Sequence, residues 1–167
     1  MDRALVLERR IRVLLLLFMA GLVISGVTAF PLQSELSAIT QGLGIDPAAD
    51  PEVYDAARGW LATVERALRD TNQRYPFLAY GTDWLAFAHL VIAIAFVGPL
   101  RDPVRNVWVL QFGMIACVAV LPTAWIAGAV RGIPLVHRLV DCLFGVVGFV
   151  PLWLAYRATR ELEELRV

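Results

Sequence analysis

Ionisable side chains lie inside or beside three apolar stretches in the second half of this chain. The stretches cover residues 84–96, 107–129 and 134–156. The ionisable side chains are Asp83, His89, His137, Arg138 and Asp141. Charged groups at the depth of a bilayer are costly, so they usually mark a functional site or a specific contact between helices. An aspartate beside an imidazole could relay protons, and two histidines on different helices could ligate a haem iron.

The composition indicates an integral membrane protein. The chain has 167 residues, of which 59% are hydrophobic, and its formal net charge is zero because 15 basic residues balance 15 acidic ones. This is too apolar for an ordinary soluble domain, and no basic excess points to nucleic acid. The two cysteines, Cys117 and Cys142, fall inside predicted spans and are interpreted as small core residues.

Four apolar segments predict an all-α integral membrane protein, a four-transmembrane-helix bundle that forms a single domain over residues 1–167. The segments cover about residues 11–30, 84–99, 107–128 and 134–156. The first follows a basic flank, as in a signal peptide, but it is about twenty residues long and no Ala-x-Ala cleavage site follows it. We therefore expect it to be a retained membrane anchor.

Arginines predict the orientation of the four spans. One set of span ends is flanked by Arg3, Arg9, Arg10, Arg12, Arg101, Arg105, Arg157, Arg160 and Arg166. The short loop on the other side carries Arg131 alone. Because cytoplasmic loops are enriched in Lys and Arg, both termini are predicted to be cytoplasmic, in a bacterial inner membrane. Aromatic anchors agree: Trp84 and Trp125 lie at the predicted outer ends, and Trp108 and Trp153 at the inner ends.

Residues 31–82 are predicted to form a helical extracytoplasmic loop. Asp50-Pro51-Glu52 is typical of a helix start, since it combines a side-chain cap, a first-turn proline and an acid near the helix dipole. Apolar residues then recur at helical spacing to about Arg74. The apolar stripe must pack across the outer mouth of the bundle or against a partner.

Residues 157–167 are predicted to continue the last span as a charged cytoplasmic helical tail. The pairs Arg157/Glu161 and Arg160/Glu164 have i,i+4 spacing, which stabilises a solvated helix end. This explanation requires no function for the tail.

The polar residues of the spans are predicted to form a layer in the outer half of the membrane. From the helical rise, His89, Thr123 and Asp141 have a similar depth, and His137 and Arg138 lie one turn shallower. Arg138 could pair with Asp141 at i,i+3. It could also extend to the outer surface, in which case His89 alone would pair with Asp141. Asp83 lies about 9 Å shallower than His89 and is interpreted as the N-cap of the second span.

Small residues predict which faces of the helices pack closely. On the fourth span His137, Asp141, Gly145 and Gly148 form one stripe, and on the second Ala86, His89 and Ala93 form another. Since missing side chains let helices approach, we expect these two stripes to face each other and to bring His89 to Asp141. Gly21, Ser25 and Ala29 give the first span its own packing face.

Three short runs carry a resemblance. They are Gly81-Thr82-Asp83-Trp84-Leu85-Ala86-Phe87-Ala88-His89, Asp102-Pro103-Val104-Arg105-Asn106 and Arg138-Leu139-Val140-Asp141-Cys142-Leu143-Phe144-Gly145. They look like those of small four-span inner-membrane proteins of bacteria to which no activity is assigned. The resemblance covers about residues 80–155 and implies no substrate.

The leading functional hypothesis is a non-enzymatic accessory or assembly subunit of an inner-membrane complex, in which the polar layer holds the bundle together. The alternative is a homo-oligomeric proton-coupled carrier that uses His89 and Asp141. A haem-binding electron-transfer protein with His89 and His137 as ligands ranks third. A hydrolase that uses Asp83 and Asp141 ranks last, and no catalytic residue or metal site is predicted. The expected partners are the lipid bilayer and either another membrane protein or further copies of this chain.

Overall fold

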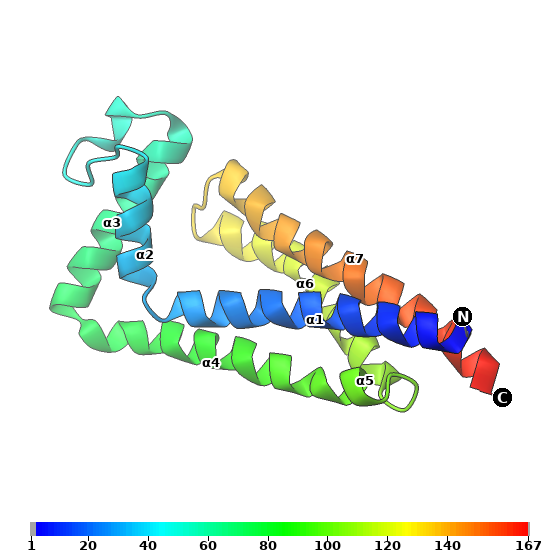
Figure 1. Ribbon diagram of the computed structural model, residues 1–167. Helices are drawn as coiled ribbons and strands as arrows, with labels where there is room; N and C mark the ends of the chain where they lie inside the picture. The colour runs from blue at the N-terminus through cyan, green and yellow to red at the C-terminus, as the bar shows by residue number, and fades with distance from the viewer. Residues whose placement is uncertain (1–2, 167) are drawn as a thin grey trace. The chain divides into compact units, whose positions relative to one another are not determined.

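The computed structural model describes residues 3–166, and no β-strand occurs among them (Figure 1). The helices are α1 (Arg3–Ala29), α2 (Leu32–Gly42), the 3-10 turn η1 (Pro51–Val53), α3 (Ala56–Arg74), the 3-10 turn η2 (Pro76–Ala79), α4 (Tyr80–Ala95), α5 (Val97–Arg101), α6 (Val107–Val130) and α7 (Leu135–Arg166). Four helical stretches are long and apolar enough to cross a membrane: Arg3–Ala29, Pro76–Arg101, Val107–Val130 and Leu135–Arg166. The predicted all-helical class with four helices of spanning length is confirmed.

The chain divides into two compact units. Unit 1 combines the described part of Met1–Val23 with Val91–Val167, and unit 2 is Ile24–Leu90. The boundaries fall within α1 and α4, so each of these helices contributes to both units. Unit 1 holds most of the apolar core, and unit 2 holds the loop between the first two spans.

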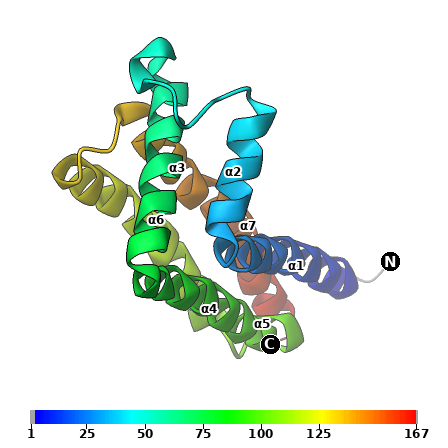
Figure 2. The ribbon, with the colours of Figure 1, turned by 90° about the vertical axis from the view of Figure 1, so that its left-hand side faces the viewer.

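A tight turn joins α6 to α7 in unit 1, and the two helices lie side by side in Figures 1 and 2. Gly132 has a φ of +68°. Its amide donates to Ala129 O at 3.2 Å, and the amide of Ile133 donates to Gly128 O at 2.9 Å. This pair of bonds is the Schellman motif, which satisfies the last carbonyls of a helix and requires a left-handed residue, here a glycine. The turn makes α6 and α7 antiparallel neighbours.

The core of unit 1 joins the beginning of α1 to the end of α7. The buried apolar side chains of these two segments are Leu7, Ile11, Leu15, Leu152, Ala155, Ala158 and Leu162. They recur every three or four residues, so each helix presents one stripe to the core. The tail is therefore a packed part of the bundle, and the interpretation of a solvated helix end is corrected.

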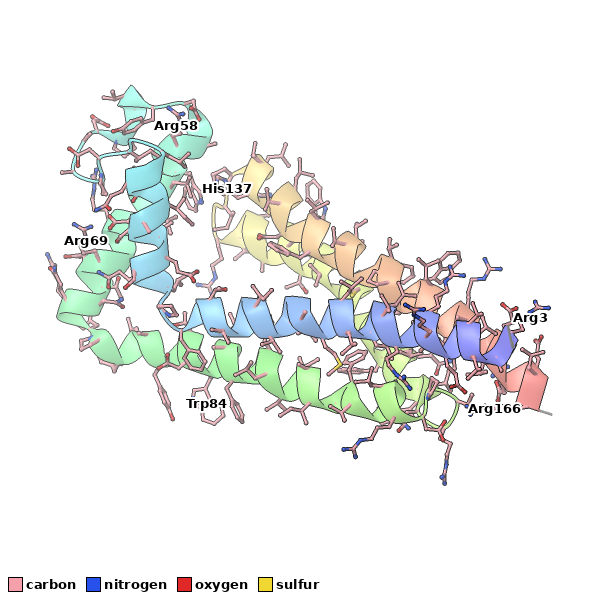
Figure 3. All side chains as sticks on the ribbon, viewed as in Figure 1. Arg3, Arg58, Arg69, Trp84, His137 and Arg166 are labelled. Carbon is pink, nitrogen blue, oxygen red and sulfur yellow. The ribbon has the colours of Figure 1, made fainter. Side chains whose placement is uncertain are left out.

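The ion pairs of the tail also differ from the predicted i,i+4 pairs. Glu161 accepts hydrogen bonds from Arg3, and Glu8 accepts one from Arg166 at 2.9 Å. Arg160 pairs with Glu163 at i,i+3. The predicted pairs do not form among residues 3–166, because Glu161 bonds to Arg3 of α1 and Arg160 bonds to Glu163 of its own helix. These cross-helix bonds hold the two ends of the described chain together (Figure 3).

Replacing Leu162 by alanine is expected to lower the free energy of unfolding by about 2–5 kcal/mol, because the fully buried side chain leaves a cavity between α7 and α1. Leu165→Ala is the matched control, since Leu165 is 48% exposed on the same segment. Both variants are compared by reversible unfolding in mixed micelles. Equal losses in the two variants would show that the tail is not packed against α1.

In unit 2 the loop between the first two spans folds into a helical hairpin of α2 and α3, seen from another side in Figure 2. Asp50 caps η1, where it accepts from the Glu52 amide at 3.1 Å. The long helix starts later than predicted, at Ala56, because Tyr54 is extended and Asp55 provides the second cap. The predicted helical loop is therefore present with a break after its first turn.

The face that α3 buries is more polar than its apolar stripe predicts. The residues buried on α3 are Gly59, Ala62 and Glu65. Glu65 is fully buried, accepts a hydrogen bond from Ser37 at 2.9 Å and forms an ion pair with Arg69. A buried carboxylate is stable only when it is paired. Glu65 is thus a central contact of the hairpin.

Candidate intramembrane polar site

His89 is half-buried on α4 and uses its own helix as a partner. Its Nδ1 lies 2.8 Å from Leu85 O, one turn earlier. Within unit 2 its Cβ faces Gly26 of α1: a methyl group at Gly26 would lie 3.1 Å from that Cβ and 3.0 Å from Ala86 O. The small-residue stripe of α4 therefore packs against α1 at this level.

The glycine stripe of α7 packs against α6. A Cβ at Gly145 would lie 2.5 Å from Cys117 O, and one at Gly148 would lie 3.0 Å from Cys117 Sγ and 3.3 Å from Phe18. Gly145 and Gly148 are thus positions of close helix contact, as predicted, and their neighbour within unit 1 is α6. The tight turn after α6 supplies this neighbour. The expected contact of the stripe with Ala86 and His89 of α4 stays a prediction, because those residues belong to unit 2.

The predicted packing face of α1 lies elsewhere on the helix. A Cβ at Gly21 would meet no atom within 4 Å among the described residues, and both Gly21 and Ser25 are exposed. The close approach occurs at Gly26, which is buried. A shift of one residue rotates the contact by about 100° around a helix.

Arg138 stabilises the turn between α6 and α7. Its Nε donates to Ile133 O at 2.5 Å, and its Cγ and Cδ would lie 2.9 Å from a Cβ at Gly128. No ion pair between Arg138 and Asp141 forms in the described part of the chain. The guanidinium is held by a carbonyl of the turn between α6 and α7, so Arg138 does not pair with Asp141 on its own helix.

Thr123 and His137 also form hydrogen bonds to backbone carbonyls a few residues earlier in the chain. Thr123 Oγ1 donates to Ala119 O at 2.8 Å, directly after Pro122, which lacks an amide proton. His137 is half-buried in the first turn of α7, and its amide donates to Pro134 O at 3.1 Å. A hydroxyl can donate to the carbonyl four residues earlier, so Thr123 needs no partner from another helix.

Asp141 differs from these residues because its own helix cannot satisfy it. It is exposed on α7, and no hydrogen bond or ion pair to its carboxylate occurs among residues 3–166. An ionised carboxylate only accepts hydrogen bonds, and the amides of a helix interior are already bonded to carbonyls. Its donor must therefore come from another helix or another molecule.

The predicted pairings of the two histidines join the two units. His89 belongs to unit 2, whereas Asp141 and His137 belong to unit 1. The contact of His89 with Asp141 and the haem site both stay predictions for this reason. Among the described residues, no group of three or more His, Cys, Asp or Glu side chains is arranged to hold a metal ion.

Asp83 is not the N-cap of the second span. Helix α4 begins at Tyr80 and follows η2 directly, so Asp83 lies in the first turn of α4. The helical backbone before Asp83 starts at Pro76, and proline favours the first turn of a helix because its φ is already fixed near the helical value. The local polar contact is made by Thr82, whose hydroxyl donates to Ala79 O at 2.7 Å. An acid in a first turn is stabilised by the helix dipole, and this accounts for Asp83.

Sequence reasoning missed a cleft of about 250 Å³ in unit 2. It lies beside the hairpin, and its lining includes Phe30, Gln33, Leu68, Asn72, Leu78 and Thr82. Asn72 donates to Gln33 Oε1 at 2.7 Å, and its own carbonyl oxygen is buried without a hydrogen bond. The polar positions of α2 and α3 at helical spacing were the available signal.

Comparison with known proteins gives no match: no family model matches the chain, and no curated protein or solved structure is significantly similar to it. Function must therefore be inferred from the chain's own residues.

Proposed function

We propose that the protein is a non-enzymatic accessory or assembly subunit of a bacterial inner-membrane complex. In this proposal both termini are cytoplasmic, and Asp141 engages a helix of the complex that carries a hydrogen-bond donor or a cation. The observation that carries the proposal is the Asp141 carboxylate, which lies in an apolar helix of spanning length and has no donor among the described residues of unit 1.

The energetic argument concerns the cost of that carboxylate. An aspartate near the centre of a spanning helix costs about 2.5–3.5 kcal/mol on insertion scales. A typical hydrogen bond between membrane helices returns about 0.6 kcal/mol. The cost is lower in the outer half of the membrane, where Asp141 is predicted to lie, but a cation or several donors on a partner helix offset it more fully than a single neutral donor does. The apolar surface beside Asp141, which includes Phe144 at 71% exposure, would pack against the same helix.

The arrangement of arginines in unit 1 supports the proposed orientation. The bonds of Arg3 with Glu161 and of Arg166 with Glu8 bring the beginning of α1 and the end of α7 to one end of the unit (Figure 3). Arg131 lies at the opposite end, in the turn between α6 and α7. Since arginines concentrate at cytoplasmic span ends, this distribution favours cytoplasmic termini.

Site-specific crosslinking in native membranes tests the proposal. A photoreactive residue at position 144 lies about 60° around α7 from Asp141, and one at position 143 lies on nearly the opposite face. Both native side chains are exposed, Phe144 at 71% and Leu143 at 56%, so position 143 is the matched control. We expect position 144 to trap a different membrane protein, position 143 not to do so, and Asp141→Leu to abolish the crosslink.

Thr123→Val is the control substitution, because it removes a polar group whose hydroxyl is bonded to its own helix. It should leave the crosslink unchanged. Crosslinks that join only copies of this chain would contradict the accessory-subunit proposal, as would a crosslink that survives Asp141→Leu. If the crosslink survives Asp141→Leu, and His89→Leu lowers stability as much as Asp141→Leu does, the donor to Asp141 is His89 of the same chain.

A further inference from the structure

A second polar feature lies at the end of unit 1 where the chain's two described ends meet. A cleft of about 60 Å³ is lined by residues of α1, α5, the loop after α5 and the end of α7. Its charged residues are Glu8, Arg12, Arg101 and Arg166. Three guanidinium groups and one carboxylate thus surround one small cleft, which is a strongly positive environment.

The acids near this cleft are already engaged by one of the three arginines. Arg166 Nη2 lies 2.9 Å from Glu8 Oε1, and its Nη1 lies 3.8 Å from Asp102 Oδ1. No acidic side chain of residues 3–166 lies within ion-pair distance of Arg12 or Arg101. Both side chains are exposed on their helices and line the cleft. Their positive charge is therefore available to a ligand.

We propose that this cleft binds a phosphate group, and that its source is the headgroup of an anionic phospholipid. Guanidinium groups present planar pairs of donors that match phosphate oxygens and keep their charge at any physiological pH. Basic pockets between membrane helices bind anionic headgroups for the same reason. This proposal is independent of Asp141 and of any partner protein.

The surroundings of Arg12 favour a lipid over a soluble phosphate. The neighbouring residues on α1, Val13, Leu16 and Leu17, are all exposed apolar side chains. An acyl chain can lie along this surface while its phosphate occupies the cleft. Trp108 at the start of α6 and Trp153 of α7 are also exposed, as expected where a helix passes through the headgroup region.

Lipid retention measured by native mass spectrometry tests the proposal. The full-length protein is released from nanodiscs that contain equal amounts of phosphatidylglycerol and phosphatidylcholine. We expect the wild-type protein to retain phosphatidylglycerol preferentially. Arg12→Gln combined with Arg101→Gln should weaken this binding about 10- to 30-fold, since each arginine near a headgroup contributes about 1 kcal/mol.

The matched control is Arg9→Gln combined with Arg105→Gln, which removes the same charge from the same end of the unit outside the cleft. It should bind phosphatidylglycerol as the wild type does. Thermal unfolding in phosphatidylcholine nanodiscs checks that both double variants remain folded, with midpoints close to the wild type.

A second arm separates the two sources of phosphate. Thermal unfolding in neutral detergent is followed with added phosphatidylglycerol, phosphatidylcholine or inorganic phosphate. Stabilisation by phosphatidylglycerol alone supports a lipid site. Equal stabilisation by inorganic phosphate, lost in the cleft variant, supports a phosphate site with a soluble ligand and overturns the lipid source. Equal losses in the cleft and control variants would indicate diffuse attraction and overturn the site altogether.

Discussion

Replacing Gly145 by leucine is expected to separate α6 from α7 and to lower the free energy of unfolding by about 3 kcal/mol. A Cβ at this position would lie 2.5 Å from Cys117 O. The obstacle is a backbone oxygen of a continuous helix, so no side-chain rotation relieves the clash. Because α6 and α7 also carry the core of unit 1, the loss should extend beyond the local contact.

Gly21→Leu is the matched control for this substitution. Gly21 lies in another helix of spanning length, and a Cβ there meets no atom within 4 Å among the described residues. Both substitutions gain the same helix propensity, about 1 kcal/mol relative to glycine, so their difference isolates the steric effect. Unfolding in mixed micelles gives both values. Similar stability of the two variants would mean that α7 does not approach α6 at Gly145.

The sequence predicts the helices well because their signals are local. Long apolar runs predict the four helices of spanning length. The start of α3 was misplaced for a local reason as well. Two capping aspartates, Asp50 and Asp55, follow each other closely, and the first caps only a single 3-10 turn.

The neighbours of each helix face could not be predicted in the same way. Gly145 and Gly148 indicate that some helix comes close, but a stripe of glycines does not encode which helix fills it. The connection between helices does encode the neighbour, because a turn of four residues between α6 and α7 makes those two helices adjacent. Using the short turn first would have assigned the glycine stripe to α6.

The tail shows how a charge pattern can conceal a packing pattern. Arg160/Glu164 suggests a solvated helix, yet Ala158 and Leu162 continue the buried stripe of the same helix. Acidic and basic residues at i,i+4 can pair within their own helix or with residues of α1, as Glu161 does with Arg3. The choice depends on a tertiary contact between segments that are about as far apart in the chain as possible.

The candidate site was predictable in its chemistry but not in its partners. The sequence identifies Asp141 as a costly group in a helix of spanning length, and the structure adds that Arg138 is engaged elsewhere. Glu65 was missed because it lies among loop residues where acids are common, and only the packing of α2 on α3 makes it buried.

Replacing Arg69 by alanine is expected to destabilise the α2–α3 hairpin by about 3 kcal/mol, because it leaves the carboxylate of Glu65 buried without a cation. Ser37 would be its remaining donor among the described residues. Hydrogen exchange of the α3 amides measures the effect, because it reports the local opening of the α2–α3 hairpin separately from global unfolding. We expect the protection of α3 to fall while that of α7 is retained.

Two further variants distinguish a buried charge from a lost surface contact. Arg74→Ala removes an i,i+4 pair of the same helix, with Asp70 at 2.9 Å, but both side chains are exposed, so the loss should be below about 1 kcal/mol. Adding Glu65→Leu to Arg69→Ala should restore much of the protection, because no orphaned charge remains in the hairpin. If the double variant is less protected than Arg69→Ala alone, the Glu65 carboxylate stabilises the hairpin even without Arg69. The prediction of an orphaned charge would then be wrong.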